Sequence, residues 1–555
     1  MIMRKNILAA LATVVAISSC STKELVPDSS AVKDDSGAPS FTAEISNIST
    51  RTTLADGSSS GKKKVNWDAS DRLCVAFTSK SPQGDAGYFL GSYTVTPDGD
   101  NPSKALLSAA SSQYELNTEN PQSVIAIYPE SVSILHMPET INNLDGRKDT
   151  RETSEFAGDI MNYVMTVNFP SVQTWDLNDV SYAPMVGLSD GKSPLKFYNL
   201  SSILAIEVPY SQMPSVDSIK VTADKYIAGL AYPQVSDSGE PFMTMEKDSQ
   251  TAWMLGCPLS KTIMLDCGGV EIPEEGSVTF YVAVPAAEYG FLRFDVYGDH
   301  DGSRMVTKDG ATISLARNKV YDIDFNGRPF VEIGGKIWSK INLGATTVAG
   351  SYETCYGDYY AWGEVTPRYT GITFTSKSEA KITGWTSEHP NGYQNIDYPK
   401  YTKNSLDASH DAAVVAWGDN WHTPSKQDFV DLLAACSDGT DAEVLSSSKP
   451  KAGIYWVNST QTYIAEFTGA AGFLFIPKED PAKRLFFPAA GSIGPGNYNG
   501  GATYGHYYAS EKPNTYYAYS MRFFNRNYPN KPTVNPTESG YYRFYGFTIR
   551  PVADE

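Results

Sequence analysis

Apolar and polar residues alternate with a period of two along much of the chain up to residue 325. Phe41, Ala43 and Ile45 begin the pattern, which returns at residues 204–208, 278–284, 292–296 and 321–325. Such alternation places one face of a strand on a core and the other face in water. Helical spacing is nearly absent from this region, so the pattern predicts antiparallel β-sandwiches.

The pattern changes after residue 328, where aromatic residues and glycines become dense. Residues 412–417 and 425–436 show helical spacing, and Ser425 stands where it can cap the second helix. Clustered rings with few aliphatic residues predict a loop-rich α+β domain whose small core is packed by aromatic side chains. We expect this core to include the tryptophans at four positions, Trp338, Trp362, Trp417 and Trp421.

The chain therefore divides into five predicted segments. A signal peptide spans residues 1–19, and a Ser-, Asp- and Lys-rich tether spans 20–40. Two tandem β-sandwiches follow at 41–190 and 191–328, separated by a polar turn, and the loop-rich domain covers 329–555. The predicted fold class is mainly β.

The leader has the features of a bacterial lipoprotein signal. Arg4 and Lys5 precede an apolar run at residues 7–17, and two small residues stand directly before Cys20. The run is too short to span a bilayer permanently, so we expect cleavage before Cys20 and acylation of its sulfur. The charged pair at 23–24 resembles the signal of surface-exposed lipoproteins of the Bacteroidetes. These features predict a lipid-anchored protein on the outer membrane, and the alternative is a plain signal peptide.

The composition argues against two classes of binding partner and against a disulfide-rich fold. The net charge of −18 and the pI near 4.9 argue against nucleic acid or an anionic membrane surface, because both would repel the chain. After Cys20 the remaining five cysteines are thinly spread, so no disulfide scaffold is predicted. Cys257 and Cys267 could pair, or they could be two buried thiols.

Catalytic and metal-binding patterns are weak. The six histidines are scattered without metal-ligand spacing, and the Gly-x-Ser-x-Gly match at 57–61 lies in a Ser/Gly loop without a strand-turn-helix context. Residues 511–514 are similar to the Glu-Pro-Asn motif of calcium-dependent lectins, but Lys512 interrupts it. The sequence therefore predicts a protein that is not an enzyme, with no cofactor and no metal site.

Several segments in the β region resemble fimbrillin-like proteins, which are pilus subunits of Bacteroidales. The matching segments include residues 50–54, 65–71, 126–129 and 318–321. The resemblance implies that a trypsin-like protease cuts after an arginine in the first strand. Loss of that strand would open a groove for a strand from another pilin subunit. Arg51 stands at the matching place, and its alternative is an ordinary arginine in a hairpin loop.

The last 220 residues are similar to the Fibrobacter succinogenes major paralogous domain, on segments 356–364, 487–491 and 546–552. That family is related to the C-type lectin-like fold, which implies a binding module. Binding tends to lie in loops on a rigid scaffold. We therefore expect ligand contacts in two loops rich in tyrosine and asparagine, at Tyr498, Tyr504, Tyr507, Asn514 and Asn525.

Together these features predict a pilus tip adhesin on the cell surface. A stalk subunit needs a free carboxyl-terminal strand to donate, whereas this chain continues into a whole further domain. The expected partners are pilin subunits, the outer membrane through the lipid, and a glycan or host-protein ligand. The alternative is a surface lipoprotein that binds such a ligand but never polymerises.

Overall fold

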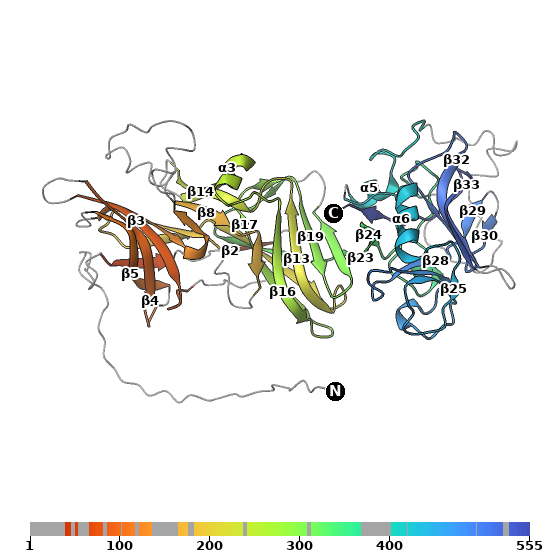
Figure 1. The fold of residues 1–555 in the computed structure, drawn as a ribbon, viewed down its shortest axis with the longest axis horizontal. Helices are drawn as coiled ribbons and strands as arrows, with labels where there is room; N and C mark the ends of the chain where they lie inside the picture. Colours follow the sequence, from red (N-terminus) through yellow and green to blue (C-terminus); the bar gives the residue numbers. More distant parts are fainter. Residues whose placement is uncertain are drawn as a thin grey trace, which may run out of the picture. The chain divides into compact units, whose positions relative to one another are not determined.

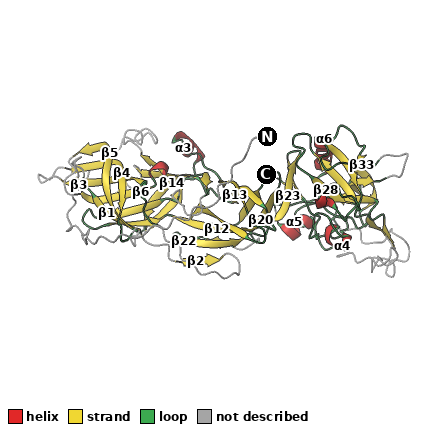
Figure 2. Ribbon diagram, turned by 90° about the horizontal axis from the view of Figure 1, so that it is seen from below, coloured by secondary structure: helices red, strands yellow, loops and turns green. Residues whose placement is uncertain are grey.

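The computed structural model describes residues 39–45, 50–53, 66–80, 86–101, 103–116, 121–135, 165–175, 183–236, 241–307, 312–367, 401–418, 420–494, 497–525 and 532–554. Strands dominate these residues (Figure 2), so the predicted mainly β fold is confirmed. The chain divides into two compact units. The first contains residues 1–46, 65–126 and 187–197, and the second contains the rest.

Seven strands of the first unit form one closed sheet (Figure 1). Their order is β1 (Phe41–Ile45), β11 (Leu195–Asn199), β10 (Met185–Ser189), β6 (Pro121–Tyr128), β3 (Arg72–Lys80), β4 (Ala86–Pro97) and β5 (Lys104–Leu116). Leu73, Val75 and Phe77 of β3 are at most 1% exposed, and the intervening Cys74 and Ala76 are buried as well. The architecture differs from the predicted antiparallel sandwich, because the sheet closes on itself and β1 runs parallel to β11.

The predicted boundary at residues 190–191 falls inside this closed sheet. The polar turn there connects β10 to β11, and both strands belong to the same sheet. The carboxylate of Asp190 accepts hydrogen bonds from the backbone N–H groups of Lys192 and Ser193, which fixes the turn. A polar turn between two apolar segments therefore marks a hairpin here.

Besides a two-stranded sheet of β18 (Glu288–Tyr289) and β21 (Ile313–Ser314), the first part of the second unit contains three larger sheets. One has the order β17 (Ser277–Pro285), β12 (Ser201–Pro209), β22 (Lys319–Asp324), β2 (Thr50–Thr53). Another has the order β15 (Pro241–Met245), β14 (Gly229–Val235), β8 (Met165–Phe169), β7 (Ser133–Leu135), and the helix α3 (Ser249–Met254) follows β15 in the chain. The third contains β20 (Gly302–Val306), β19 (Leu292–Tyr297), β13 (Ser215–Ala223), β16 (Thr262–Glu271) and β9 (Val172–Thr174). The side-chain amide of Gln173 in β9 donates a hydrogen bond to the carbonyl of Ala283 in β17 and accepts one from its backbone N–H. These two bonds join the third sheet to the first.

The third sheet continues into the loop-rich domain. It extends past β20 through β23 (Arg328–Ile333), β24 (Lys336–Ser339) and β34 (Val552–Ala553). Phe330 of β23 aligns with Gly302 of β20, and Trp338 of β24 aligns with Val552 of β34. The predicted boundary at residues 328–329 therefore lies within a strand of a shared eight-stranded sheet.

This shared sheet overturns one expectation from the alternating pattern. Leu292, Phe294 and Val296 of β19 are buried as expected, but Arg293 and Asp295 on the opposite face are buried as well. Arg293 donates to Asn420 of the loop-rich domain at 3.1 Å. The face predicted to meet water is covered because the loop-rich domain packs against it.

The loop-rich domain combines short strands with three helices among its described residues. The helices are α4 (Tyr352–Cys355), α5 (Ala412–Trp417) and α6 (Lys426–Cys436). The strands are β25 (Glu443–Val444), β26 (Gly453–Val457), β27 (Gly472–Ile476), β28 (Leu485–Pro488), β29 (Ser492–Gly494), β30 (Asn497–Asn499), β31 (Tyr504–Tyr508), β32 (Tyr517–Phe524) and β33 (Thr533–Tyr542). Both predicted helices are confirmed, and Ser425 caps α6 in a reciprocal capping box with Asp428.

The predicted aromatic core is confirmed for Trp338, Trp362 and Trp421, which are buried, whereas Trp417 is partly exposed. Cys257 and Cys267 are buried free thiols, and burial raises the pKa of both. No helix within the described ranges has both the length and the apolar character needed to cross a membrane.

Candidate functional site

The five residues of β1 complete the closed sheet by pairing with two strands that lie far away in the sequence. Residues 43–45 align in parallel with residues 195–197 of β11, and residues 41–44 align antiparallel with residues 104–107 of β5. Without β1, the facing edges of β5 and β11 would present unpaired N–H and C=O groups. The strand therefore fills the gap between β5 and β11.

Every second side chain of β1 fills a pocket in the first unit. Phe41, Ala43 and Ile45 are at most 5% exposed. The ring of Phe41 lies 5.8 Å from that of Phe77 and 5.9 Å from that of Tyr93, measured between centroids. Burial of Phe41 and Ile45 stabilises the strand by about 1.5–3 kcal/mol for each side chain. These pockets select an apolar residue at alternate positions of any strand that fills this gap.

The chain just before β1 is also attached to the fold. The hydroxyl of Tyr93 donates to the carbonyl of Pro39 at 2.8 Å, and Ser40 is buried. The end of the segment predicted as a tether is therefore part of the structure. Cys20 and the predicted signal peptide lie outside the described residues.

Arg51 belongs to β2, so the structure does not place it in a hairpin loop. The main chain of β2 aligns in parallel with β22, and Arg51 faces Val320. β2 is the last strand of its sheet, so its other side is not paired within that sheet. A protease could reach the bond after Arg51 only when β2 leaves β22, because proteolysis requires a locally unfolded segment.

The tyrosines predicted to contact ligand are mostly buried. Tyr507 is fully buried and its hydroxyl donates to the carbonyl of Pro488 at 2.7 Å. Burial raises the pKa of Tyr507 to about 12. Tyr498 is 9% exposed and its hydroxyl donates to the carbonyl of Ala490 at 3.0 Å. Both hydroxyls therefore hold the main chain, and neither side chain is open to a ligand in this structure.

The other three predicted ligand residues are partly or fully exposed. Tyr504 is partly exposed at the start of β31, and the backbone N–H of Asn525 donates to the carbonyl of Thr503 at 2.9 Å. Asn514 is exposed, and its side-chain oxygen accepts from the N–H groups of Tyr516 and Tyr517. That bonding makes Asn514 a turn residue.

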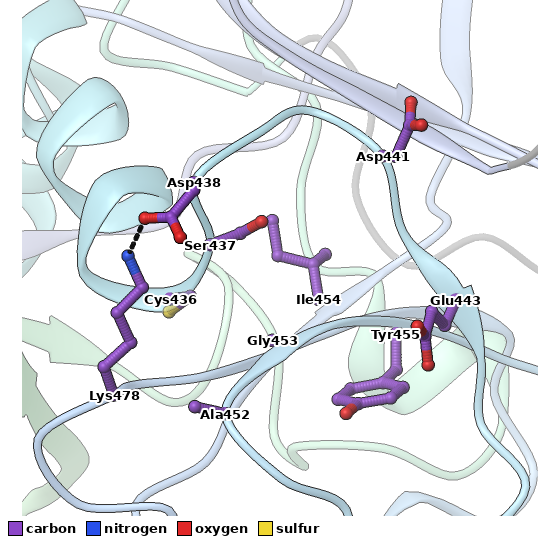
Figure 3. Close-up of a pocket in the computed structure, with 10 residues that line it drawn as sticks. All are labelled: Cys436, Ser437, Asp438, Asp441, Glu443, Ala452, Gly453, Ile454, Tyr455 and Lys478. Carbon is purple, nitrogen blue, oxygen red and sulfur yellow. Dashed lines mark hydrogen bonds and ion pairs between the residues drawn. The ribbon is translucent and has the colours of Figure 1, made fainter.

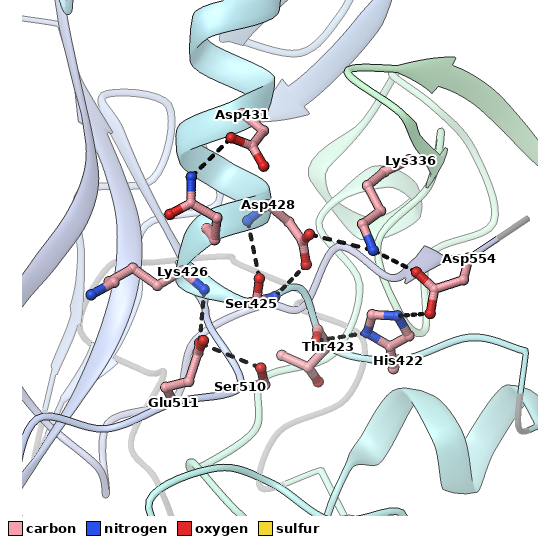
Figure 4. Close-up of polar contacts among 11 residues, drawn as sticks. Lys336, His422, Thr423, Ser425, Lys426, Asp428, Asp431, Ser510, Glu511 and Asp554 are labelled. Atoms are coloured by element: carbon pink, nitrogen blue, oxygen red, sulfur yellow. Dashed lines mark hydrogen bonds and ion pairs between the residues drawn. The ribbon is translucent and has the colours of Figure 1, made fainter.

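The segment similar to a calcium-dependent lectin motif is used structurally (Figure 4). A carboxylate oxygen of Glu511 accepts from the backbone N–H of Lys426 at 2.7 Å, in the first turn of α6. A negative charge at this end of a helix is stabilising, because the first N–H groups have no partner within the helix. Lys512 is buried and donates to the carbonyl of Thr402 at 3.1 Å. Neither side chain is directed toward an open binding surface.

A polar pocket of about 260 Å³ lies beside the end of α6 and the strands β25 and β26 (Figure 3). Asp438, Asp441, Glu443, Tyr455 and Lys478 line it. The ammonium of Lys478 already donates to Asp438 at 2.6 Å. The remaining carboxylates can accept hydrogen bonds from hydroxyl or ammonium groups.

Sequence reasoning missed this pocket because its lining comes from three separate segments and carries no motif. Among the residues that the structure describes, no group of three histidine, cysteine or carboxylate side chains is arranged to hold a metal ion.

No protein-family model matches the chain, and no curated protein matches it either. Solved structures that are similar include candidate cell adhesion proteins from Bacteroides ovatus, Bacteroides uniformis and Bacteroides fragilis. Their sequences are 10%, 13% and 10% identical to this one, and the TM-scores are 0.25, 0.27 and 0.24. The matches cover 48%, 52% and 53% of this chain, and 86%, 94% and 94% of the other chains. At these TM-scores the likeness assigns neither a family nor a function to this chain.

Proposed function

We propose that this chain is a surface adhesin subunit that joins a pilus by strand exchange after its first strand has been removed. The placement of β1 carries the proposal. A short amino-terminal strand, paired on both sides with distant strands and anchored by alternate apolar side chains, can be replaced by another strand without rearranging the rest of the sheet. Cleavage after Arg51 would detach β1 from the remainder of the chain.

The proposal assigns a terminal position in the pilus to this subunit. The β region is followed by a folded domain, and β34 of that domain pairs with β24 and is buried. β34 is therefore not available to a neighbouring subunit. The loop-rich domain would bind a glycan or a host protein, and the acylated Cys20 would hold the precursor at the outer membrane.

One observation favours a second function, that of a lipoprotein which binds its ligand without polymerising. Arg51 lies in a paired strand, and a paired strand is a poor substrate for a protease. If β2 stays on β22, β1 remains covalently attached and the closed sheet persists.

Limited proteolysis distinguishes the two functions. The full chain with Cys20→Ser, which cannot be acylated, would be treated with a limiting amount of an arginine-specific protease and followed by mass spectrometry. A synthetic peptide with the sequence of residues 39–48 would serve as the donor strand, because it carries the apolar pattern of β1. The Arg51→Gln variant is the control.

For a pilus subunit we expect one early cut after Arg51, loss of the fragment that contains β1, and binding of the labelled peptide only after the cut. The Arg51→Gln variant should keep β1 and exclude the peptide. Resistance at Arg51, or a cut chain that retains its own β1 fragment and excludes the peptide, would contradict strand exchange and support the tethered lipoprotein.

A further inference from the structure

His506 occupies an unusual environment in the sheet formed by β31, β32 and β33. It lies in the middle of β31 and aligns with Arg522 of β32, which in turn aligns with Asn535 of β33. The neighbouring pairs Tyr507–Met521 and Gly505–Phe523 alternate with it. Their side chains Tyr507, Met521 and Phe523 belong to the apolar core on the opposite face. His506 and Arg522 therefore share the second face of the sheet.

Aromatic rings enclose the imidazole of His506. The ring of Phe547 is stacked on it with centroids 4.5 Å apart, and the ring of Tyr541 meets it edge-on at 4.2 Å. Tyr504 of the same strand lies at 5.5 Å. The side chain is fully buried, and neither of its ring nitrogens has a hydrogen-bond partner among the residues that the structure describes. A buried imidazole of this kind can remain only in its neutral form, because nothing solvates or accepts a second proton.

The charged groups on this face oppose protonation. Arg522 is the neighbouring cation, and it forms an ion pair with Glu538 of β33 at 3.5 Å. Both of these side chains are partly exposed, at 31% and 23%, so the pair is weak. The rings of Tyr508, Tyr541 and Tyr545 pack against Phe547, and the ring of Tyr504 lies beside His506. Desolvation by burial, followed by the charge of Arg522, keeps the pKa of His506 well below its ordinary value of 6.5.

We propose that His506 makes this face of the domain sensitive to acid, such that a proton on the imidazole opens the covering segment 541–549 away from β31. The segment meets β31 through Phe547 and Tyr541 and through a hydrogen bond from the backbone N–H of Tyr508 to the carbonyl of Thr548 at 3.3 Å. Backbone bonds that Gly546 exchanges with Ile493 and Phe547 exchanges with Tyr360, at 2.8–3.1 Å, hold it as well, so opening must also break these bonds. When the segment moves away, water can solvate the imidazolium and separate it from Arg522. The open form would expose rings in the region where Tyr504 lies.

The direction of the effect follows from proton linkage. The open form takes up a proton as the pH falls through about 6.5, whereas the closed form does not. The closed form is therefore most stable above pH 6.5 and loses stability below it. Between pH 7 and pH 5 the opening equilibrium should increase roughly 25-fold if the closed imidazole stays neutral throughout. This device is independent of strand exchange at β1.

Amide hydrogen exchange of the full chain, measured by mass spectrometry at pH 7 and pH 5 and corrected for intrinsic exchange rates, tests the proposal. Protection of β31, β33 and residues 541–549 should fall by up to about 25-fold at pH 5. In His506→Phe, which keeps a ring between Phe547 and Tyr541, this extra loss should disappear. His506→Gln, which is polar but does not titrate, provides the same test if the phenylalanine variant does not fold.

The matched control is His410→Gln, because His410 is partly exposed and already pairs with Asp407 at 2.8 Å. That variant should show the same acid-dependent loss of protection in residues 541–549 as the unmodified chain. Equal protection at the two pH values in the unmodified chain, or an unchanged loss in both His506 variants, would overturn the proposal.

Discussion

Removal of the Asp295 carboxylate should cost more stability than removal of any surface carboxylate in the chain. Asp295 is fully buried on β19 and receives bonds from Nε and Nη2 of Arg304 at 2.5 and 3.1 Å. Nε of Arg293 lies 3.2 Å from the same carboxylate. In Asp295→Ala two buried guanidinium groups would face each other without a counter-charge.

The magnitude follows from the burial of the pair. Breaking a buried ion pair by removing one partner typically costs 3–5 kcal/mol, because the remaining charge stays buried without compensation. Arg304 retains contacts with the rings of Phe330 and Trp421 and a hydrogen bond to the carbonyl of Asp554, but none of these carries a full negative charge. We therefore expect a loss of about 3–5 kcal/mol for Asp295→Ala.

Asp438→Ala is the matched control. The side chain of Asp438 is 98% exposed and pairs with Lys478 at 2.6 Å, so its removal should change the stability very little, because solvent screens the pair. Urea unfolding, read by pulse proteolysis of the second unit, would compare the two variants. A cost for Asp295→Ala as small as that for Asp438→Ala would refute the reasoning. The double variant Asp295→Leu with Arg304→Met should be less destabilised than Asp295→Ala, because it leaves one buried guanidinium, that of Arg293, without a counter-charge instead of two.

Three further substitutions should have smaller effects on stability. Ser425→Ala should lower the stability of the loop-rich domain by about 1 kcal/mol, because the capping box of α6 is lost, and circular dichroism during urea unfolding would record it. Tyr507→Phe should lower the stability by about 1 kcal/mol, because the hydrogen bond to the carbonyl of Pro488 is lost, and it should leave any ligand affinity unchanged. A change in affinity without a change in stability would contradict the structural role of this hydroxyl. Gly344→Ala should reduce the thermal midpoint, because φ is +83° and a Cβ would stand 2.3 Å from Asp358, and an unchanged midpoint would show that the loop adapts.

The sequence pattern correctly predicted those elements that depend on only a few neighbouring residues. The period of two located β1, and the cap at Ser425 located the start of α6 to the residue. The mainly β fold and the burial of Trp338 also followed from composition and pattern. Each of these features depends on interactions with adjacent residues or on simple apolarity.

Features set by contacts distant in the sequence could not be predicted. Arg293 and Asp295 occupy the polar positions of an alternating strand, and only the packing of the loop-rich domain shows that both are buried. A tyrosine among glycines has the same local pattern whether it faces solvent or, like Tyr507, holds a carbonyl inside the core. Parallel pairing of β1 with β11 depends on a partner 150 residues away, which no local pattern specifies.

The shared eight-stranded sheet has a consequence for how this protein can be rearranged by evolution or by engineering. A domain joined by a linker can be transplanted into another protein, because few contacts cross its boundary. Here a graft that begins at residue 329 would remove Arg328 from β23 and leave the rest of β23 without its partner strand β20, and Phe330 and Trp421 without the Arg304 side chain that contacts their rings. The smallest portable piece should therefore include both β19 and β20. Recombination between related proteins should exchange the loop-rich domain together with its neighbour.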